Sequence, residues 1–199
     1  MKQTKLQKQI SEMNQAFKKA SKAQKRVMIA QDVIAQIKAK RYVPESGTFV
    51  IANWSEKIDY KDHSDNIQEA FQKKQIETCQ VCALGGLFMS CTNLNNNTNF
   101  EQLEQAEDLG EMIDNEERIS NGMDKFFSVN QLKLIETYFE NAQGYFRDYE
   151  VSINIPESHR NAFHNQYLDD DERMIAIMEN IVNNKGTFIP KKLKVLNNY

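Results

Sequence analysis

Cys79-Gln-Val-Cys-Ala-Leu-Gly-Gly-Leu-Phe-Met-Ser-Cys91 is the apolar half of the longest uncharged run in the chain, Thr78 to Phe100. If this stretch is helical, its apolar residues fall on every side of the helix, and such a helix is usually buried all round. We therefore expect residues 79–91 to form a buried central helix against which the other elements pack. Gly85 and Gly86 would each cost roughly 1 kcal/mol relative to alanine inside a helix. We expect the close approach of another helix to be the reason for them.

The composition favours one folded, mainly helical domain. The 199 residues include only 3 Pro and 7 Gly, and 27% are charged, which argues against a low-complexity or disordered chain. No apolar window reaches about 18 residues, so no membrane span is expected, and residues 1–8 lack the apolar core of a secretory signal. Three cysteines, an odd number, fit a reducing cytoplasm better than a disulfide framework.

Charge is distributed very unevenly along the chain. Residues 1–41 hold eleven Lys/Arg and two acids, a balance of +9, whereas the remaining 158 residues hold 14 Lys/Arg and 26 acids, a balance of -12. Such asymmetry raises the expectation of an electrostatic partner, although the basic helix could also close on the acidic body of its own chain. We divide the chain into a basic helical arm, residues 1–20, and a single α+β domain, residues 21–199.

The basic arm carries a narrow apolar seam. Leu6, Ile10, Met13 and Phe17 recur at intervals of 4, 3 and 4, which predicts a helix over residues 3–20 that packs through one edge. This 6–17 seam could join two copies of the chain in a homo-oligomer. Ser21 and Gln24 form a capping box that predicts a second helix over residues 22–39. One continuous helix is the alternative, because no Gly or Pro interrupts residues 1–43.

Three short segments predict a small β-sheet: residues 48–52, 149–155 and 187–189. The first and third repeat a Gly-Thr-Phe pattern after a helix, so we expect them to lie in the same sheet. Ser128 and Gln131 form a second capping box, which predicts a helix ending near Gly144. The acids at 169–172 predict the start of a last long helix, because negative charge there complements the helix dipole. The fold class is therefore mainly α, with this sheet beside the central helix.

The three cysteines are the strongest candidates for chemistry. A Cys-x-x-Cys pair at a helix N-terminus can lower a thiol pKa and exchange disulfides, but residues 72–78 before Cys79 are mostly polar rather than strand-like. His63, Cys79, Cys82 and Cys91 are residue types that zinc accepts. On one helix, however, Cys91 would face away from the other two, so buried core cysteines are the favoured interpretation. We expect no metal, cofactor or catalytic residue.

Three segments resemble a family of small uncharacterised proteins encoded by phages and prophages. They are Lys25-Arg-Val-Met-Ile-Ala-Gln-Asp-Val-Ile34 with Ser46-Gly-Thr48 behind it, Cys79-Gln-Val-Cys-Ala-Leu-Gly85, and Arg173-Met-Ile-Ala-Ile-Met-Glu-Asn-Ile181 followed by Gly186-Thr-Phe-Ile-Pro190. Together they cover under a third of the chain. The resemblance implies a phage-encoded accessory protein of the host cytoplasm, which acts by binding a host or defence protein. It assigns no functional residue.

The leading functional hypothesis is therefore a non-enzymatic, protein-binding accessory factor. Its expected contact residues are basic ones in the N-terminal helices (Lys2, Lys5, Lys8, Lys18, Lys19, Lys22, Lys25 and Arg26) and acids of the 101–118 segment (Glu104, Glu107, Asp108 and Glu111). A nucleic-acid-binding protein that uses Lys2 to Arg26 on phosphates is the alternative. A thiol- or metal-dependent enzyme at Cys79 and Cys82 is the third hypothesis.

Overall fold

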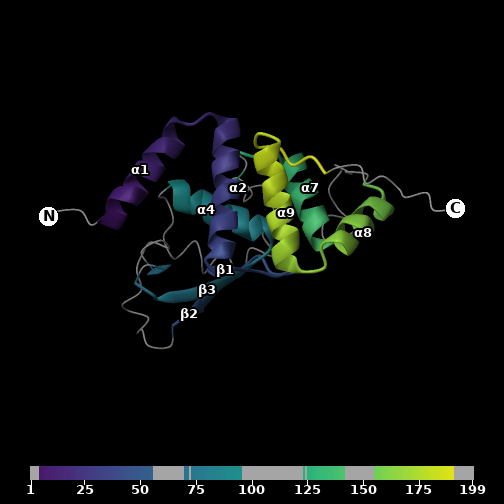
Figure 1. Ribbon diagram of the computed structural model, residues 1–199, viewed down its shortest axis with the longest axis horizontal. Coiled ribbons are helices and arrows are strands. Elements are labelled where there is room, and N and C mark those ends of the chain that lie inside the picture. Colours follow the sequence, from purple (N-terminus) through teal and green to yellow (C-terminus); the bar gives the residue numbers. More distant parts are fainter. Residues whose placement is uncertain are drawn as a thin grey trace.

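The computed structural model describes residues 5–55, 70–71, 73–95, 123, 125–141 and 155–190, and the side chains of 5–11 and of residue 95 are excepted. Its elements run in the order α1 (Lys5–Lys19), α2 (Lys22–Lys38), β1 (Tyr42–Pro44), β2 (Val50–Trp54), β3 (Ile76–Val81), α4 (Ala83–Asn95), α7 (Val129–Glu140), α8 (Glu157–Gln166) and α9 (Asp170–Asn183). The expected class is confirmed, because helices dominate and the sheet is small (Figure 1). None of the described helices combines the length and apolarity that crossing a bilayer requires.

The core lies where α2, α4 and α9 meet. Figure 1 shows α2 and α9 side by side, with α4 passing behind them. Ile29 and Val33 of α2, Leu87 and Met89 of α4, and Met174 and Ile177 of α9 are all fully buried. Fully burying one such side chain stabilises the fold by about 1.5–3 kcal/mol. The helices therefore form one hydrophobic body, with α7 and α8 against its far side and the sheet beneath it.

The stretch at 79–91 is buried as expected, but its first part is not helical. Residues Ile76–Val81 form β3, the central strand of a sheet with the order β1-β3-β2. β3 pairs in parallel with β1, where Tyr42 faces Cys79, and antiparallel with β2, where Val50 faces Val81. The helix α4 begins only at Ala83. Our prediction of one helix over 79–91 was wrong because a short apolar run looks the same in a buried strand as in a buried helix.

Gly85 and Gly86 have different structural reasons. A Cβ atom at Gly85 would lie 1.6 Å from the carbonyl oxygen of Phe49, so the close neighbour is the backbone before β2 rather than another helix. Gly86 faces side chains of the core, with its nearest neighbours Met174 and Val33 each 3.5 Å from such an atom. Only Gly85 is therefore required by a backbone contact.

The predicted sheet is only partly correct. Its first strand is observed as β2, shifted to Val50–Trp54. Residues 187–189 form no strand, because the main-chain groups of Phe188 and Ile189 bind side chains of α7 and α9 instead of neighbouring strands. They therefore do not share a sheet with 48–52. The predicted strand 149–155 falls outside the described residues except for Ile155, which is not in a strand.

Helix starts were predicted well from local chemistry, whereas the predicted end near Gly144 is wrong, because α7 ends at Glu140 and Asn141 follows in the left-handed conformation. The Ser21 hydroxyl accepts a hydrogen bond from the Gln24 amide, and the Gln24 side chain accepts one from Ser21, so the described residues 5–38 form two helices rather than one. Ser128 caps α7 through the Gln131 amide. Asp169 caps α9 by accepting hydrogen bonds from the amides of Asp171 and Glu172. Side-chain capping of this kind stabilises a helix by about 1 kcal/mol.

Candidate functional site

The three cysteines lie in the interior on two different elements. Cys79 is in β3, Cys82 precedes α4 and Cys91 lies in the third turn of α4, and their exposed fractions are 0%, 5% and 4%. A strand does lead into Cys82, contrary to our expectation that residues 72–78 are not strand-like. Cys79 nevertheless lies within that strand rather than at the helix end, and all three thiols are free.

Burial works against thiol chemistry at these positions. Removal from water raises the pKa of Cys79 to about 12 and raises the pKa of Cys82 and Cys91 further. The thiolate is the reactive and metal-binding form, so these thiols are protonated near neutral pH. Among the described residues, no three His, Cys, Asp or Glu side chains gather in a group that could hold a metal ion. His63, the fourth residue of the zinc hypothesis, lies outside that part of the chain.

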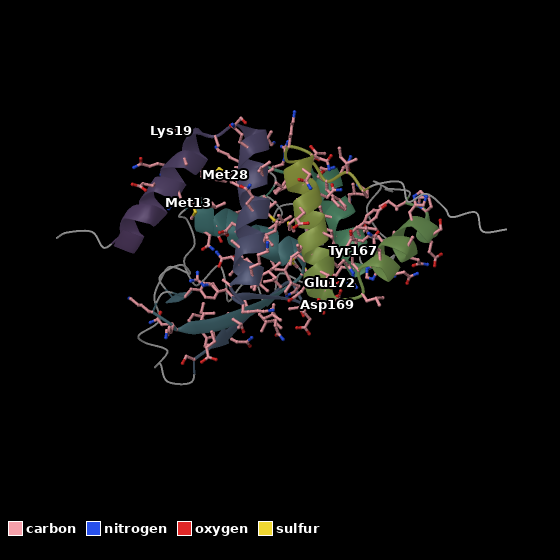
Figure 2. All side chains as sticks on the ribbon, viewed as in Figure 1. Met13, Lys19, Met28, Tyr167, Asp169 and Glu172 are labelled. Carbon is pink, nitrogen blue, oxygen red and sulfur yellow. The ribbon has the colours of Figure 1, made fainter. Side chains whose placement is uncertain are left out.

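Three of the predicted contact lysines gather where α1 meets α2. Lys18 and Lys19 end α1, and Lys22 opens α2. Their side chains are exposed, and Figure 2 shows Lys19 at the upper edge of the molecule, away from Tyr167 and Asp169. None of the three has an ion-pair partner within the described residues. We call Lys18, Lys19 and Lys22 the basic corner.

Lys25 and Arg26 differ from the basic corner because they contact the chain itself. The Lys25 ammonium lies 5.5 Å from the centre of the Phe17 ring and 5.9 Å from that of Phe126. The Arg26 guanidinium donates to the carbonyl oxygens of Gly186 and Phe126. These two side chains therefore help to fix α1 and the chain after α9 onto α2.

The remaining predicted contacts fall where the structure is not described. Lys2 and the acids Glu104, Glu107, Asp108 and Glu111 lie outside the described residues, and for Lys5 and Lys8 only the helical backbone is described. The acidic segment 101–118 thus stays a prediction. The seam is described only in its second half, where Phe17 is buried and packs edge-on to Phe126 at 5.4 Å.

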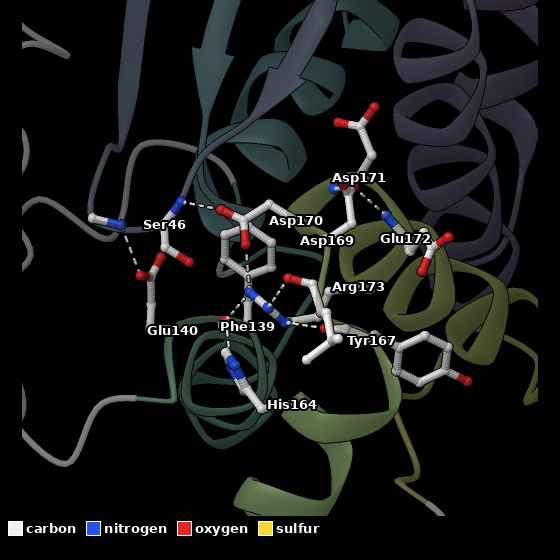
Figure 3. A network of polar contacts seen from close by, with 12 residues as sticks. Ser46, Phe139, Glu140, His164, Tyr167, Asp169, Asp170, Asp171, Glu172 and Arg173 are labelled. Carbon is white, nitrogen blue, oxygen red and sulfur yellow. Dashed lines mark hydrogen bonds and ion pairs between the residues drawn. The ribbon is translucent and has the colours of Figure 1, made fainter.

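A polar junction that the sequence did not reveal centres on Arg173 (Figure 3). Its guanidinium is buried and donates to the carbonyl oxygens of Phe139, Tyr167 and Leu168, and it forms an ion pair with Asp170. The second oxygen of Asp170 accepts the amide of Ser46 at 2.8 Å, beside Glu140, which accepts the amide of Gly47 at the same distance. The junction therefore joins the β1–β2 turn to α7, α9 and the loop between α8 and α9.

Two carboxyl groups of α7 are unusually weak acids. Burial raises the pKa of Glu136 to about 8, helped by the charge of Glu140, and burial raises the pKa of Glu140 to about 7. One Glu136 oxygen is buried without a hydrogen-bond partner. Strongly shifted acids are common at functional sites, but structural positions also produce them. Glu136 and Glu140 are one turn apart on α7, a spacing that the sequence shows, whereas their burial depends on the packing.

A second buried acid lies between α2 and α4. Asp32 accepts a hydrogen bond from the side-chain Nε2 of Gln36 at 3.0 Å. Burial raises the pKa of Asp32, and nearby Ser90 and Asn93 oppose that shift. The Tyr42 hydroxyl, fully buried in the same region, accepts a hydrogen bond from Asn93. These contacts explain why the polar residues Ser90 and Asn93 occur on the otherwise apolar helix α4.

Comparison with known proteins adds no family to this description. No protein-family model matches the chain, and neither a curated protein nor a solved structure matches it. The candidate site is therefore defined by the residues alone.

Proposed function

We propose that this protein is a non-enzymatic, protein-binding accessory factor, encoded by a phage and directed at host or defence machinery, and that the basic corner is part of its contact surface. The observation that carries the proposal is the exposure of Lys18, Lys19 and Lys22 where α1 meets α2, with no ion pair to an acid of the described residues. Exposed charge without an internal partner favours the approach of an oppositely charged surface.

Several features support a structural role for the other candidates. The buried cysteines have raised pKa values, which disfavours a thiolate nucleophile. Lys25 and Arg26 stabilise the packing of α2, so they contribute to the shape of the corner rather than to its free charge. The acids of 101–118 remain a second proposed contact surface on the same protein.

Affinity capture from the native host tests this proposal. The bait chains are the wild type and a triple variant with Lys18→Ser, Lys19→Ser and Lys22→Ser, which removes three exposed charges without touching the core. A control chain with Lys38→Ser, Lys125→Ser and Lys185→Asn loses the same charge at other exposed positions. We expect a specific protein that is retained by the wild type and the control but not by the triple variant. Capture that is equal for all three chains would contradict the role of the basic corner.

Nucleic-acid binding is the alternative that the same lysines support, because they could neutralise phosphates as well as carboxylates. In that case, binding of purified protein to DNA or RNA should weaken steeply with salt. Loss of three phosphate contacts in the triple variant would also reduce the slope of log affinity against log salt by about 3. Retention on nucleic acid with this behaviour, and no specific protein partner, would replace the leading proposal by this one.

A further inference from the structure

The segment that follows α9 folds back over α7 and α9. The chain turns at Lys185 and Gly186, whose φ angles are +54° and +91°. A side chain at Gly186 would be obstructed as well as strained, because its Cβ atom would lie 2.6 Å from the carbonyl oxygen of Ala23. The Arg26 guanidinium binds the Gly186 carbonyl and fixes the turn on α2. We call the residues after this turn, 187–190, the strap.

Two side-chain amides hold the main chain of the strap. Gln131 of α7 accepts the Phe188 amide at 2.8 Å and donates to the Phe188 carbonyl at 3.3 Å. Asn180 of α9 accepts the Ile189 amide at 2.8 Å and donates to the Ile189 carbonyl at 2.8 Å. We call Gln131 and Asn180 the amide clamp. It satisfies both polar groups of two consecutive residues, as the two strands that flank a central strand would do together.

The side chains of Phe188 and Ile189 in the strap differ in burial. Phe188 is 1% exposed and its ring packs edge-on to the Tyr138 ring, with the centroids 5.5 Å apart. Ile189 is 53% exposed, so it is held mainly through its backbone. The contact thus requires one aromatic side chain and an extended main chain, and little else of the sequence.

Domains that recognise a peptide by strand addition use the same two kinds of contact, main-chain hydrogen bonds and a site for a side chain. Main-chain hydrogen bonds provide affinity for any extended segment, and a site for one side chain provides specificity. Here the four main-chain bonds of Phe188 and Ile189 all come from side chains of α7 and α9, which lie outside the strap. A different extended segment with an aromatic residue could therefore make the same four hydrogen bonds and the same ring contact.

We propose that the amide clamp and Tyr138 form a recognition site for an extended segment of a partner protein that carries an aromatic residue, and that the strap occupies this site until the partner displaces it. The inference rests on the proposed protein-binding function and names the class of partner segment. A second copy of this chain is a poorer occupant, because its own strap is tethered by the turn that Arg26 fixes on α2. A free segment of a partner has no such tether.

Fluorescence anisotropy with a labelled synthetic peptide, Lys-Gly-Thr-Phe-Ile-Pro, tests the proposal on the full-length chain. Phe188→Ala weakens the strap as a competitor, so the peptide should bind this variant at least about tenfold more tightly than the wild type. The peptide in which alanine replaces phenylalanine should lose this binding. Adding Gln131→Ala to the Phe188→Ala chain should also lose it, because the clamp then holds only one of the two residues.

A second variant covers the case in which Phe188→Ala does not fold. Ile189→Pro removes the amide that Asn180 accepts but leaves Phe188 in the core, and the position is exposed. It should bind the peptide several-fold more tightly than the wild type. Absence of peptide binding to both variants at millimolar concentration, or equal binding to variants and wild type, would overturn the proposal. A wild-type dimer that Phe188→Ala abolishes would overturn the choice of partner in favour of a second copy.

The outcome is separable from that of the proposed function. Peptide binding depends on Gln131, Tyr138 and Asn180, whereas host capture depends on the basic corner. Failure of the peptide test leaves the capture experiment unaffected, and a chain that captures nothing can still bind the peptide.

Discussion

At the scale of single residues, two neighbouring glycines show how differently the fold uses the same residue type. Gly85 lies directly beneath the carbonyl group of Phe49, at a distance where no side chain fits. Gly86 has only ordinary van der Waals neighbours, with Met174 and Val33 at 3.5 Å. The sequence suggests close packing at both positions, but only the structure shows that one of them meets backbone.

We expect Gly85→Ala to destabilise the protein by about 3 kcal/mol or more, because the Phe49 backbone must move away. Gly86→Ala should change the unfolding free energy by no more than about 1 kcal/mol, since the helix propensity of alanine offsets the tighter packing. Urea unfolding of the two variants, followed by circular dichroism, measures both values. Equal destabilisation by the two substitutions would contradict the contact between α4 and the Phe49 backbone.

Arg26 shows why the candidate surface could be predicted only in part. The exposure of Lys18, Lys19 and Lys22 follows from their place on the polar face of helices, which the sequence pattern shows. Arg26 has the same charge and lies in the same basic region. Its acceptors, the carbonyls of Phe126 and Gly186, are 100 and 160 residues away in the chain. No local pattern indicates such a contact, so the sequence could not separate the structural arginine from the exposed lysines.

At the scale of elements, helix starts were predictable and strand partners were not. Ser21, Ser128 and Asp169 cap helices as their local sequences indicate, because capping involves residues only two or three positions apart. A strand is defined by a partner distant in the sequence. Residues 187–189 have the composition of a strand, yet Gln131 and Asn180 take the place of the neighbouring strand. The helix predicted over residues 79–91 is wrong at its start for a related reason. The partners of β3, which are β1 and β2, cannot be recognised from the apolar run itself.

Helix α7 should make the stability of the protein depend on pH. Glu136 and Glu140 have pKa values of about 8 and about 7 in the folded chain, above the ordinary value of 4.5. The folded state therefore binds protons that the unfolded state has already lost. Their favourable contribution is complete below pH 4.5 and is lost as the pH rises through 7 and 8. Lys133 lowers the pKa of Glu136, and Arg173 and the Gly47 amide lower that of Glu140, but burial outweighs them.

The unfolding free energy should consequently fall as the pH rises from about 4.5 to about 8 and level off above that. Burial lowers the pKa of His164, whose effect has the opposite sign and is confined to lower pH. Glu136→Gln removes the ionisable group, so it should flatten the pH profile and stabilise the protein at pH 8.5 by about 2 kcal/mol. Urea unfolding at several pH values measures this change, with Glu172→Gln as an exposed control. If Glu136→Gln leaves the pH profile of the unfolding free energy unchanged, Glu136 is ionised in the folded protein without loss of stability.

At the scale of the whole molecule, the reactivity of the three cysteine thiols measures how often the core opens. They lie on β3, before α4 and within α4, so each is covered by a different part of the packed body. Their burial and raised pKa values both suppress the thiolate that an aromatic disulfide reagent needs. Reaction in the native protein therefore requires the core to open.

We expect the native chain at pH 8 to react with such a reagent at less than about a tenth of one equivalent during the first minutes, because only opened molecules expose a thiol. All three cysteines should react at once in denaturant. Leu168→Cys supplies a matched control, because Leu168 is 80% exposed and its replacement should give one rapidly reacting equivalent in the native state. If one native cysteine reacts as fast as this control, that thiol is reachable from solvent. The assignment of all three to the core would then fail, and thiol chemistry at Cys79 or Cys82 would become the better explanation of their place beside the sheet.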